Sequence, residues 1–499
     1  MKHFSLNLFY TLLFIFSFNA YSQDWDELFK AVADDGVSND VFGYSIALDG
    51  DTAVIGAYGD DDDGDFSGSA YVFVHNGGTW IQQQKLTASD GAADYAFGYS
   101  VAIDGDTVII GASGADVNGV SSGSAYIFVR SGTTWIEQQK LTASDGAAND
   151  QFGISVALDG DTVVIGANFD DDNFSLSGSA YVFVRNGTTW TQQQKLTASD
   201  GIFGANFGSS VAIDGDTAVI GTPNDGAEFY GSVYIFVRGG TTWTQQQKLI
   251  DNDGVYNANL GHSVAVDGDT VIAAAYRDSD NGNGFNSGSV YVFIRNGTTW
   301  TEEQKLTASD GFENGEFGQS VDLDGDTIVI GARYNNIDMT WSTGYAYIFV
   351  RNGTTWTEQQ KLTASDGDIG DRFGNSVAVD GDTAAIAAYW DDDNGSNSGS
   401  VYFFYNNTLS TIDVPLDQLT VNYLMGSGKL HIKSPVANTL KQVSLINLLG
   451  QTVISWDNTN DSLGFETWLP VDNIGQGYYI VKLQTRSGDT FNKKVVVKR

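Results

Sequence analysis

The residues best suited to chemistry in this sequence are aspartates that cluster in four short segments. They are Asp60, Asp61, Asp62 and Asp63; Asp170, Asp171 and Asp172; Asp278 and Asp280; and Asp391, Asp392 and Asp393. Neighbouring carboxylates on a flexible segment are the oxygen ligands that suit calcium, so these residues are candidate calcium ligands. No cluster carries a complete EF-hand-like string. Two other interpretations stay open: charged loops that keep an exported protein soluble, and a surface for a basic or polyhydroxylated ligand.

Aromatic residues stand near the same clusters, outside the regular tryptophan positions of the sequence. They are Tyr58, Tyr276, Tyr334, Trp341, Tyr389 and Trp390. Exposed aromatic rings beside carboxylates can hold a sugar, because the ring stacks on the sugar face and the carboxylates accept hydrogen bonds from its hydroxyls. These six residues are therefore candidate ligand-binding residues. The alternative is that they fill gaps between structural units.

Catalytic constellations are nearly absent. The chain has no cysteine and four histidines, which excludes disulfides, thiolate metal sites and cysteine nucleophiles and leaves too few parts for a Ser-His-Asp set or a histidine metal pair. Paired carboxylates could serve a glycosidase, but 62 acidic residues make chance pairs unavoidable. The excess of these over 25 basic residues argues against nucleic acid as a partner. We expect no catalytic residues.

The elements that carry the aspartates recur seven times. Phe-Gly occurs at Phe42, Phe97, Phe152, Phe207, Phe317 and Phe373, Leu260-Gly261 fills the one gap, and the spacing is 53 to 57 residues. Periods of this size are typical of propellers and solenoids. In the third copy four strand-like segments are expected at 152–158, 162–167, 178–185 and 188–196, with tight turns at Asp159-Gly160 and Asn186-Gly187. Four antiparallel strands per copy predict an all-β, seven-bladed β-propeller; a solenoid is the alternative.

The two ends of the array predict that the propeller closes on itself. The string Trp-x4-Lys-x4-Asp-Gly begins at Trp80, Trp135, Trp190, Trp243, Trp300 and Trp356, and the last copy of the repeat stops near Asn407 without one. The seventh string begins at Trp25, at the opposite end of the chain. An N-terminal outer strand would complete the last blade and leave no exposed sheet edge. An open solenoid offers no reason for this arrangement.

Strand order also predicts where the acidic clusters lie. In an up-and-down blade, the turns after the first and third strands emerge on one face, and the other connections emerge on the opposite face. The tight Asp-Gly and Asn-Gly turns belong to the first face, and every long connection belongs to the second, which we call the long-loop face. The aspartate clusters fall in these long connections, so we expect the long-loop face to be acidic.

The string Phe-Gly-x-Ser-Val-Ala followed by Val-Ile-Gly-Ala resembles the FG-GAP repeat, the blade of the integrin α-chain propeller and of many bacterial surface proteins. The resemblance runs from residue 25 to about residue 405 and implies the propeller fold, while leaving the ligand open. In integrin-type blades a metal sits in a long Asp-rich loop between the first two strands. Here that connection is only Asp49-Gly50-Asp51 and its repeats, too short to wrap an ion. Any calcium is therefore expected in the loops between the second and third strands.

A second domain follows the repeats. Residues 412–499 carry nine basic and seven acidic residues, and their alternating short strands predict a small β-sandwich. Leu449-Gly450-Gln451, Gly477-Tyr478-Tyr479 and a lysine-rich end resemble the C-terminal sorting domain of the type IX secretion system of Bacteroidetes. The resemblance implies an address label read by that machinery. The usual Pro-Asn-Pro start is reduced to 434–437; an ordinary binding sandwich is the alternative.

The N-terminus predicts export. Lys2 and His3 precede an apolar stretch at 6–18, and Ala20-Tyr21-Ser22 offers a signal-peptidase site. The apolar stretch is too short to span a bilayer comfortably, and we expect no transmembrane segment in the mature chain. The expected organisation is a signal peptide at 1–22, a propeller at 23–407, a linker at 408–413 and a sorting domain at 414–499. The predicted location is the outer cell surface or the medium.

These observations favour a non-enzymatic surface propeller that binds an extracellular protein or glycan through its acidic long-loop face. Calcium is the one cofactor that the residues suggest. A glycan-active enzyme and a structural surface-layer component are the alternatives. An enzyme would release products from a glycan, a binder would only change its mobility, and a structural component would associate with itself.

Overall fold

The computed structural model describes residues 25–406, except 77–78, 227–228, 252, 254–255, 280–281 and 335–342, and parts of the segment 420–497. The predicted signal peptide and linker, together with Asp280 and Trp341, lie outside the described residues. Every regular element in the described part is a β-strand. No helix there is long and apolar enough to cross a membrane.

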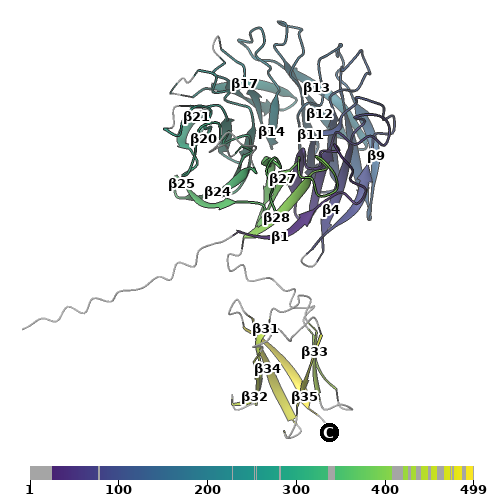
Figure 1. The fold of residues 1–499 in the computed structure, drawn as a ribbon, viewed down its shortest axis with the longest axis vertical. Helices are drawn as coiled ribbons and strands as arrows, with labels where there is room; N and C mark the ends of the chain where they lie inside the picture. Colours follow the sequence, from purple (N-terminus) through teal and green to yellow (C-terminus); the bar gives the residue numbers. More distant parts are fainter. Residues whose placement is uncertain are drawn as a thin grey trace, which may run out of the picture.

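Residues 25–406 form seven four-stranded antiparallel sheets, the blades of a propeller (Figure 1). Blade 1 contains β2 (Ser45–Asp49), β3 (Thr52–Ala57), β4 (Ser69–His75) and β5 (Trp80–Leu86). Blade 2 contains β6 (Phe97–Asp104), β7 (Thr107–Ala112), β8 (Ser124–Ser131) and β9 (Thr134–Leu141). Blade 3 contains β10 (Val156–Asp159), β11 (Thr162–Ala167), β12 (Ser179–Asn186) and β13 (Thr189–Leu196).

The remaining blades repeat this plan. Blade 4 contains β14 (Ser210–Asp214), β15 (Thr217–Thr222), β16 (Ser232–Gly239) and β17 (Thr242–Leu249). Blade 5 contains β18 (Val264–Asp267), β19 (Thr270–Ala275), β20 (Ser289–Asn296) and β21 (Thr299–Leu306). Blade 6 contains β22 (Ser320–Asp324), β23 (Thr327–Ala332), β24 (Tyr345–Asn352) and β25 (Thr355–Leu362). Blade 7 contains β26 (Phe373–Asp380), β27 (Thr383–Ala388), β28 (Ser400–Asn406) and the N-terminal strand β1 (Trp25–Ala31).

The ring closes as expected. The first strands of the blades contact their neighbours in a circle that runs from β2 through β26 and back to β2. Strand β1 pairs with β28 from Trp25↔Asn406 to Ala31↔Val401, which completes blade 7. The Gln360 side chain also joins blade 6 to β1, because its amide donates to the Trp25 carbonyl at 2.8 Å and accepts from the Trp25 amide at 2.6 Å. The expected N-terminal closure is confirmed.

The blades bury apolar residues on both sheet faces, because each blade packs between two others. All six residues of β11 are buried, and Phe152 and Trp190 are at most 2% exposed. Gly166 in β11 shows why the Val-Ile-Gly-Ala string needs glycine: a Cβ there would lie 2.0 Å from the Gly208 carbonyl oxygen of the next blade. The regular part of the first strand starts later than expected, at Val156, because Phe152 bridges to Gly123 of blade 2.

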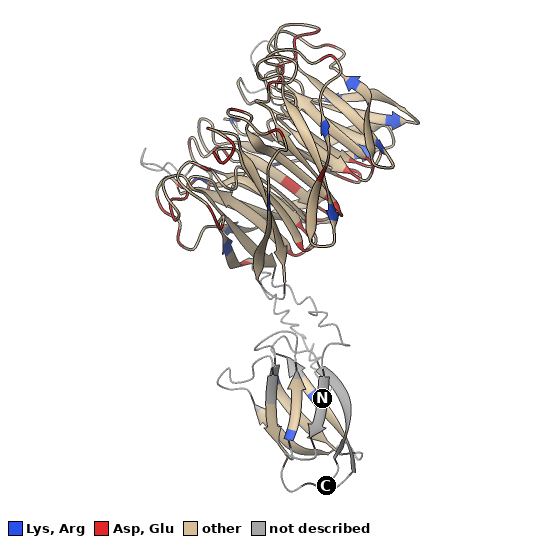
Figure 2. Cartoon of the chain, turned by 90° about the vertical axis from the view of Figure 1, so that its right-hand side faces the viewer, with Lys and Arg blue, Asp and Glu red and all other residues tan. Residues whose placement is uncertain are grey.

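The long connections gather on one side of the propeller, opposite the tight turns, and carry many of the acidic residues (Figure 2). The tight turns have the expected length, since the pairing of β10 with β11 ends at Asp159↔Thr162. Gly160 in this turn has a φ of +55°, which glycine adopts without a side-chain penalty.

The C-terminal strands form two sheets. One contains β29 (Thr420–Leu424), β30 (Lys429–Lys433) and β33 (Glu466–Pro470). The other contains β32 (Thr452–Asp457), β31 (Leu440–Ile446), β34 (Gly477–Thr485) and β35 (Thr490–Val497). Leu430 and Leu469 of the first sheet share one core with Val443 and Val481 of the second. The predicted small β-sandwich is confirmed.

Candidate functional site

The aspartate clusters of the long loops lie against lysines of the outer strands. The Lys85 ammonium in β5 is 2.7 Å from Asp60, 2.6 Å from Asp62 and 2.8 Å from Asp35. Two other blades repeat the arrangement: Lys195 contacts Asp145, Asp170 and Asp172, and Lys30 contacts Asp366, Asp391 and Asp393. In these three blades an ammonium group stands among three carboxylates, where a bound cation would otherwise be expected.

Among the described residues, the remaining lysines of the same column have one or two carboxylate partners. Lys248 contacts Asp200 and Asp225, Lys305 contacts Asp253 and Asp278, Lys140 contacts Asp90, and Lys361 contacts Asp310. In blade 2 the reason is visible in the sequence, because Ala115 stands where blade 1 has Asp60. In blade 2 the loop between the second and third strands therefore lacks the aspartate that contacts the lysine in blade 1.

A tyrosine of the third strand buries the first aspartate of each cluster. The Tyr71 hydroxyl donates to Asp60 at 3.0 Å, and the Lys85 ammonium lies 5.4 Å from the centre of the Tyr71 ring. Asp60 is 4% exposed. Burial lowers the pKa of Lys85, but hydrogen bonds to Asp35, Asp60 and Asp62 outweigh it and raise this pKa above its ordinary value. Lys85 thus stays charged and neutralises part of the cluster.

Calcium binding at these clusters stays a prediction. In the described part of the chain, Asp35, Asp60 and Asp62 offer oxygens within 4.8 Å of one another, a spacing that could hold a metal ion. Because the Lys85 ammonium contacts all three carboxylates, an incoming ion would have to displace it. The predicted ligands Asp61, Asp63, Asp171 and Asp392 are exposed in the same loops.

The predicted aromatic residues lie where second strands end on the long-loop face. Tyr58, Tyr276 and Tyr389 directly follow β3, β19 and β27, and Tyr334 lies two residues after β23. They contact residues next to the start of the first strands, such as Tyr44 and His262. The first strands form the innermost circle of the propeller. We therefore call the residues where second strands end and first strands begin on the long-loop face the channel mouth.

One aromatic cluster in the channel mouth spans blades 7, 1 and 2. The Tyr44 ring lies 4.5 Å from that of Tyr58 and 5.7 Å from that of Tyr389, and its hydroxyl is 2.9 Å from that of Tyr99. Tyr389 also contacts Trp390 at 5.6 Å. Tyr389 is only 5% exposed because these rings cover it, so the expectation that it is exposed is wrong.

A second cluster in the channel mouth belongs to blades 5 and 6. Tyr276 packs on His262 with ring centres 4.2 Å apart. Burial, together with the positive charges of Arg333 and Arg277, lowers the pKa of His262 to about 3. Tyr334 lies 5.1 Å from the Arg333 guanidinium. The structure therefore gathers the described members of the predicted aromatic set, and adds basic residues to them.

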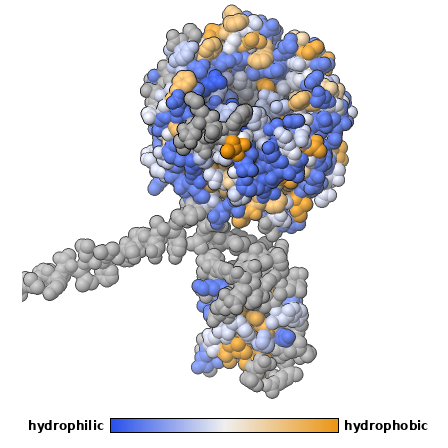
Figure 3. Space-filling view, in the orientation of Figure 1, coloured by the Kyte–Doolittle hydropathy of each residue, from blue (hydrophilic) through white to orange (hydrophobic). Residues whose placement is uncertain are grey.

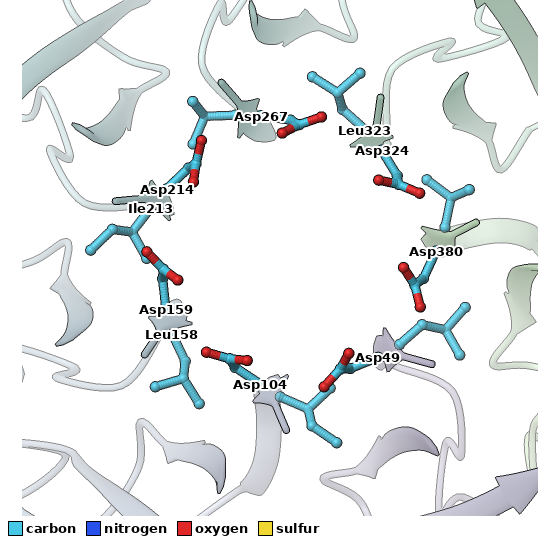
Figure 4. A pocket seen from close by; sticks show the side chains of 14 residues that line it. Asp49, Asp104, Leu158, Asp159, Ile213, Asp214, Asp267, Leu323, Asp324 and Asp380 are labelled. Carbon is cyan, nitrogen blue, oxygen red and sulfur yellow. The ribbon is translucent and has the colours of Figure 1, made fainter. Parts of the chain in front are cut away.

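The tight-turn end of the channel carries a ring of seven carboxylates that the sequence analysis did not identify. One aspartate ends each first strand, and together they line a cavity of about 370 Å³ (Figure 4): Asp49, Asp104, Asp159, Asp214, Asp267, Asp324 and Asp380. Each carboxylate accepts a hydrogen bond from a turn glycine of the next blade, as Asp49 does from Gly105 and Asp380 from Gly50. The ring thus links every blade to its neighbour.

One blade adds an eighth carboxylate near this ring. Asp322 stands where the other first strands have alanine, and it accepts hydrogen bonds from the amides of Val379 at 2.8 Å and Leu323 at 3.0 Å. Burial raises the pKa of Asp322 to about 7. The signal for the ring was present in the sequence, since every first strand ends in Asp-Gly, but turn chemistry alone explains that dipeptide.

The comparisons with known proteins agree with this architecture. The sequence matches the FG-GAP repeat over residues 25–73, 80–128, 135–183, 190–236, 243–293, 300–349 and 356–404. It matches the secretion system C-terminal sorting domain over residues 426–498. No curated protein matches the sequence.

The sorting domain means that the chain is exported through the type IX secretion system to the cell surface or the extracellular space, and that its C-terminal domain interacts with that machinery. The seven matched repeats equal the blades in number and cover more than half of the chain; each runs from the outer strand of one blade through the first three strands of the next. The chain therefore belongs to the FG-GAP repeat family.

Proposed function

We propose that the propeller is a non-enzymatic binding module that holds an extracellular protein or glycan on its long-loop face. The proposal rests on one observation, the uneven distribution of exposed large apolar side chains. Among the described propeller residues, the well-exposed ones in long connections are Val37, Phe66, Val117, Val120, Phe174, Leu176, Ile202, Phe203, Phe229, Ile250, Tyr256, Phe285 and Ile369. The others, Leu28, Ile81 and Ile136, lie on outer strands.

Such residues are costly on an exported protein, because exposed apolar side chains favour aggregation unless a partner covers them. The propeller surface is otherwise largely hydrophilic, with hydrophobic residues scattered in it (Figure 3). Phe203 is 71% exposed and Phe285 59%. Apolar side chains surrounded by acidic loops are what a ligand with both apolar and polar groups would contact.

Backbone conformation also supports the proposal that the long-loop face binds a ligand. Phe66, Leu176 and Phe229 occupy the same position in their loops with φ between +54° and +57°, a region that bulky residues avoid. Blades 5 and 7 have Asn286 and Asn397 there, and asparagine tolerates this conformation well. Three blades therefore hold an apolar side chain in a strained, exposed position, as is common where a surface binds something.

The test compares two sets of substitutions in the full exported chain. Phe174→Ser with Phe285→Ser alters the long-loop face, and Ile81→Ser with Ile136→Ser alters outer-strand residues that are 51% and 52% exposed. Both proteins and the parent are screened against extracellular proteins and glycans, with and without calcium. We expect the first pair to weaken binding at least about tenfold and the second pair to leave it unchanged.

Each other outcome contradicts the proposal in a distinct way. Equal binding by both pairs would place the ligand elsewhere. Release of products from a glycan would make the protein a glycan-active enzyme. Self-association without any ligand would favour a structural surface-layer component.

A further inference from the structure

Three basic residues of the propeller break its repeat. Residues 25–406 contain fifteen lysines and arginines. Twelve of them recur at two equivalent positions of the repeat, and each of the twelve forms an ion pair with a carboxylate. They are Lys30, Lys85, Lys140, Lys195, Lys248, Lys305 and Lys361 on outer strands, and Arg130, Arg185, Arg238, Arg295 and Arg351 on third strands. The other three are Arg277, Arg333 and Arg372. All three lie in the channel mouth, between the end of β19 and the start of β26.

Two of these arginines share neighbours. The guanidinium groups of Arg333 and Arg372 lie 5.1 and 5.4 Å from the centre of the Tyr334 ring. Arg372 stacks closely on Trp390, at 3.2 Å from the ring centre, and donates a hydrogen bond to the Tyr389 hydroxyl at 2.5 Å. Arg372 is therefore held in place by aromatic side chains rather than by a carboxylate.

The third arginine joins the group through Tyr276 and Glu316. The Arg277 guanidinium lies 5.0 Å from the centre of the Tyr276 ring. Glu316 accepts a hydrogen bond from Arg333 at 3.1 Å. Burial raises the pKa of Glu316, while the charges of Arg333, Arg277 and Arg372 lower it, so all three arginines act on this one carboxyl group.

Among the described residues, the arginines of this cluster outnumber the carboxylates that pair with them. Within the described part of the chain, Glu316 is the one carboxylate that forms an ion pair with any of the three arginines. The nearby His262 is not a further cation, because burial lowers its pKa to about 3. Like charges held close together without a counter-charge cost free energy. In a chain with 62 acidic residues and a net charge of −37, a local excess of positive charge fits an anion that arrives with a ligand.

We propose that Arg277, Arg333 and Arg372 form an anion site in the channel mouth, and that its ligand is a glycan ending in a single acidic sugar. A guanidinium that stacks on an aromatic ring uses only its face for that contact. Its N–H donors point outward in the plane of the guanidinium group, where they can bind a carboxylate or sulfate with two hydrogen bonds. Both Arg277 and Arg372 are only partly buried, so a ligand can reach them.

The surroundings limit the ligand to few negative charges. The loops around the channel mouth carry the aspartate clusters, and their field repels a polyanion over about 10 Å at moderate ionic strength. A single acidic group reaches the arginines while the rest of the ligand, being neutral, is not repelled. A sugar is favoured over an acidic peptide because the tyrosine and tryptophan rings of the channel mouth offer edges and hydroxyls to sugar rings.

This inference rests on the proposed function, since it names the ligand class for the same face.

The test measures binding of the full exported chain to a glucuronate-terminated oligosaccharide, its glucose-terminated counterpart, inorganic sulfate, heparin and a glutamate-containing peptide. We expect the glucuronate-terminated sugar to bind at least about tenfold more tightly than the glucose-terminated one, and more tightly than heparin. Raising the salt concentration should weaken this binding.

Substitutions distinguish the effect of the proposed anion site on binding from the effect of the overall charge of the propeller. Arg372→Gln and Arg277→Gln should each weaken binding of the glucuronate-terminated sugar about tenfold, with unchanged melting temperature. Arg238→Gln removes the same charge from an arginine paired with Asp216 at the tight-turn side, and should leave binding unchanged.

The remaining outcomes overturn the inference. Equal binding of the two sugars, no binding of any of the probes, or equal effects of all three substitutions would exclude the site. Tighter binding of the peptide than of the acidic sugar would make the ligand a protein, and binding of sulfate alone would reduce the site to one for small anions. If Phe174→Ser with Phe285→Ser abolishes binding of a screened ligand while Arg372→Gln does not, the proposed function stands and this inference falls.

Discussion

At the scale of single residues, the lysine of the Trp-x4-Lys string acts as a built-in cation. Its ammonium contacts up to three aspartates, as Lys195 does, and one of these, Asp170, is 2% exposed. A buried carboxylate is stable only when it is paired. This pairing offsets part of the repulsion among the aspartates of the long loops.

The first prediction removes that cation. Lys195→Met should lower the free energy of unfolding by about 3 kcal/mol, because Asp170 then stays buried without its partner. Lys361→Met is the control, with a loss of at most about 1 kcal/mol, since its described ion-pair partner Asp310 is 52% exposed. Thermal melting in millimolar calcium should restore part of the loss in Lys195→Met, by binding to the three freed carboxylates.

The parent chain decides the calcium question. With the ammonium in place, we expect calcium and sodium chloride of equal ionic strength to change its melting temperature equally. A clearly larger rise with calcium would mean that the ion displaces the ammonium, and would support the predicted calcium ligands in the long loops.

The second prediction concerns pH. Burial raises the pKa of Asp322 to about 7 in the folded chain, against 3.8 as its ordinary value. The folded state therefore binds more protons between these two values, and the contribution of Asp322 to stability falls as the pH rises from about 4 to 7. Asp322→Asn does not titrate and should remove this fall, which is on the order of 4 kcal/mol. Its single carbonyl oxygen can accept from only one of the Val379 and Leu323 amides, so this chain should also be less stable than the parent at low pH.

Urea unfolding between pH 4 and pH 8 measures the difference. Asp326→Asn is the matched control, because its side chain is exposed in the adjoining tight turn. A parent and an Asp322→Asn chain with parallel pH profiles would show that Asp322 titrates alike in the folded and unfolded states.

At the scale of the elements, the sequence predicted the strands and turns, because these depend on residues that are close together in the chain. Asp159-Gly160 and Asn186-Gly187 mark hairpins by turn preference alone. Together with the Phe-Gly and Trp-x4-Lys repeats, they predicted the blades, the closing strand and the two faces. The partners of Lys195 could not be predicted, because Asp145 and Asp170 come from two different loops. The same holds for the ring of aspartates, whose members are 53 to 57 residues apart.

The arginines of the channel mouth illustrate the same limit. Arg277 and Arg372 are separated by 95 residues, and only the closed ring of blades brings their loops together. In the sequence they look like isolated interruptions of acidic segments. A comparison of repeat columns would have found them, because they are the basic residues of the propeller that have no counterpart in other blades.

The third prediction tests the closing strand. Deleting residues 23–36 removes β1, which leaves the outer edge of β28 unpaired from Val401 to Asn406, although β27 still pairs with its other edge. The deletion also takes Lys30 away from Asp391. We expect a melting temperature more than about 10 °C lower, together with aggregation through the open edge. Attaching the same segment after residue 406 should restore both properties, whereas a truncated chain that melts like the parent would refute the role of β1.

At the scale of the whole molecule, the sorting domain and the proposed binding face belong to different parts of the chain. The propeller completes its last blade with its own N-terminal strand, so its core does not depend on residues beyond Asn406. The net charge differs as well: residues 412–499 carry nine basic and seven acidic residues, in a chain with a net charge of −37. The acidic character of the chain therefore belongs to the propeller.

The fourth prediction separates the two parts. Deleting residues 414–499 removes the sorting domain but none of the seven blades, so the purified propeller should keep its melting temperature and its ligand. In the cell this chain should collect in the periplasm, because the signal peptide still directs export while the outer-membrane machinery no longer finds its address. Fractionation with surface protease treatment measures this distribution, and the Lys361→Met chain, which keeps the sorting domain, is the control for a mildly destabilised propeller.

A tail-less chain that reaches the surface would show that the propeller carries its own export signal. A tail-less chain that unfolds would show that the propeller needs the C-terminal domain for stability.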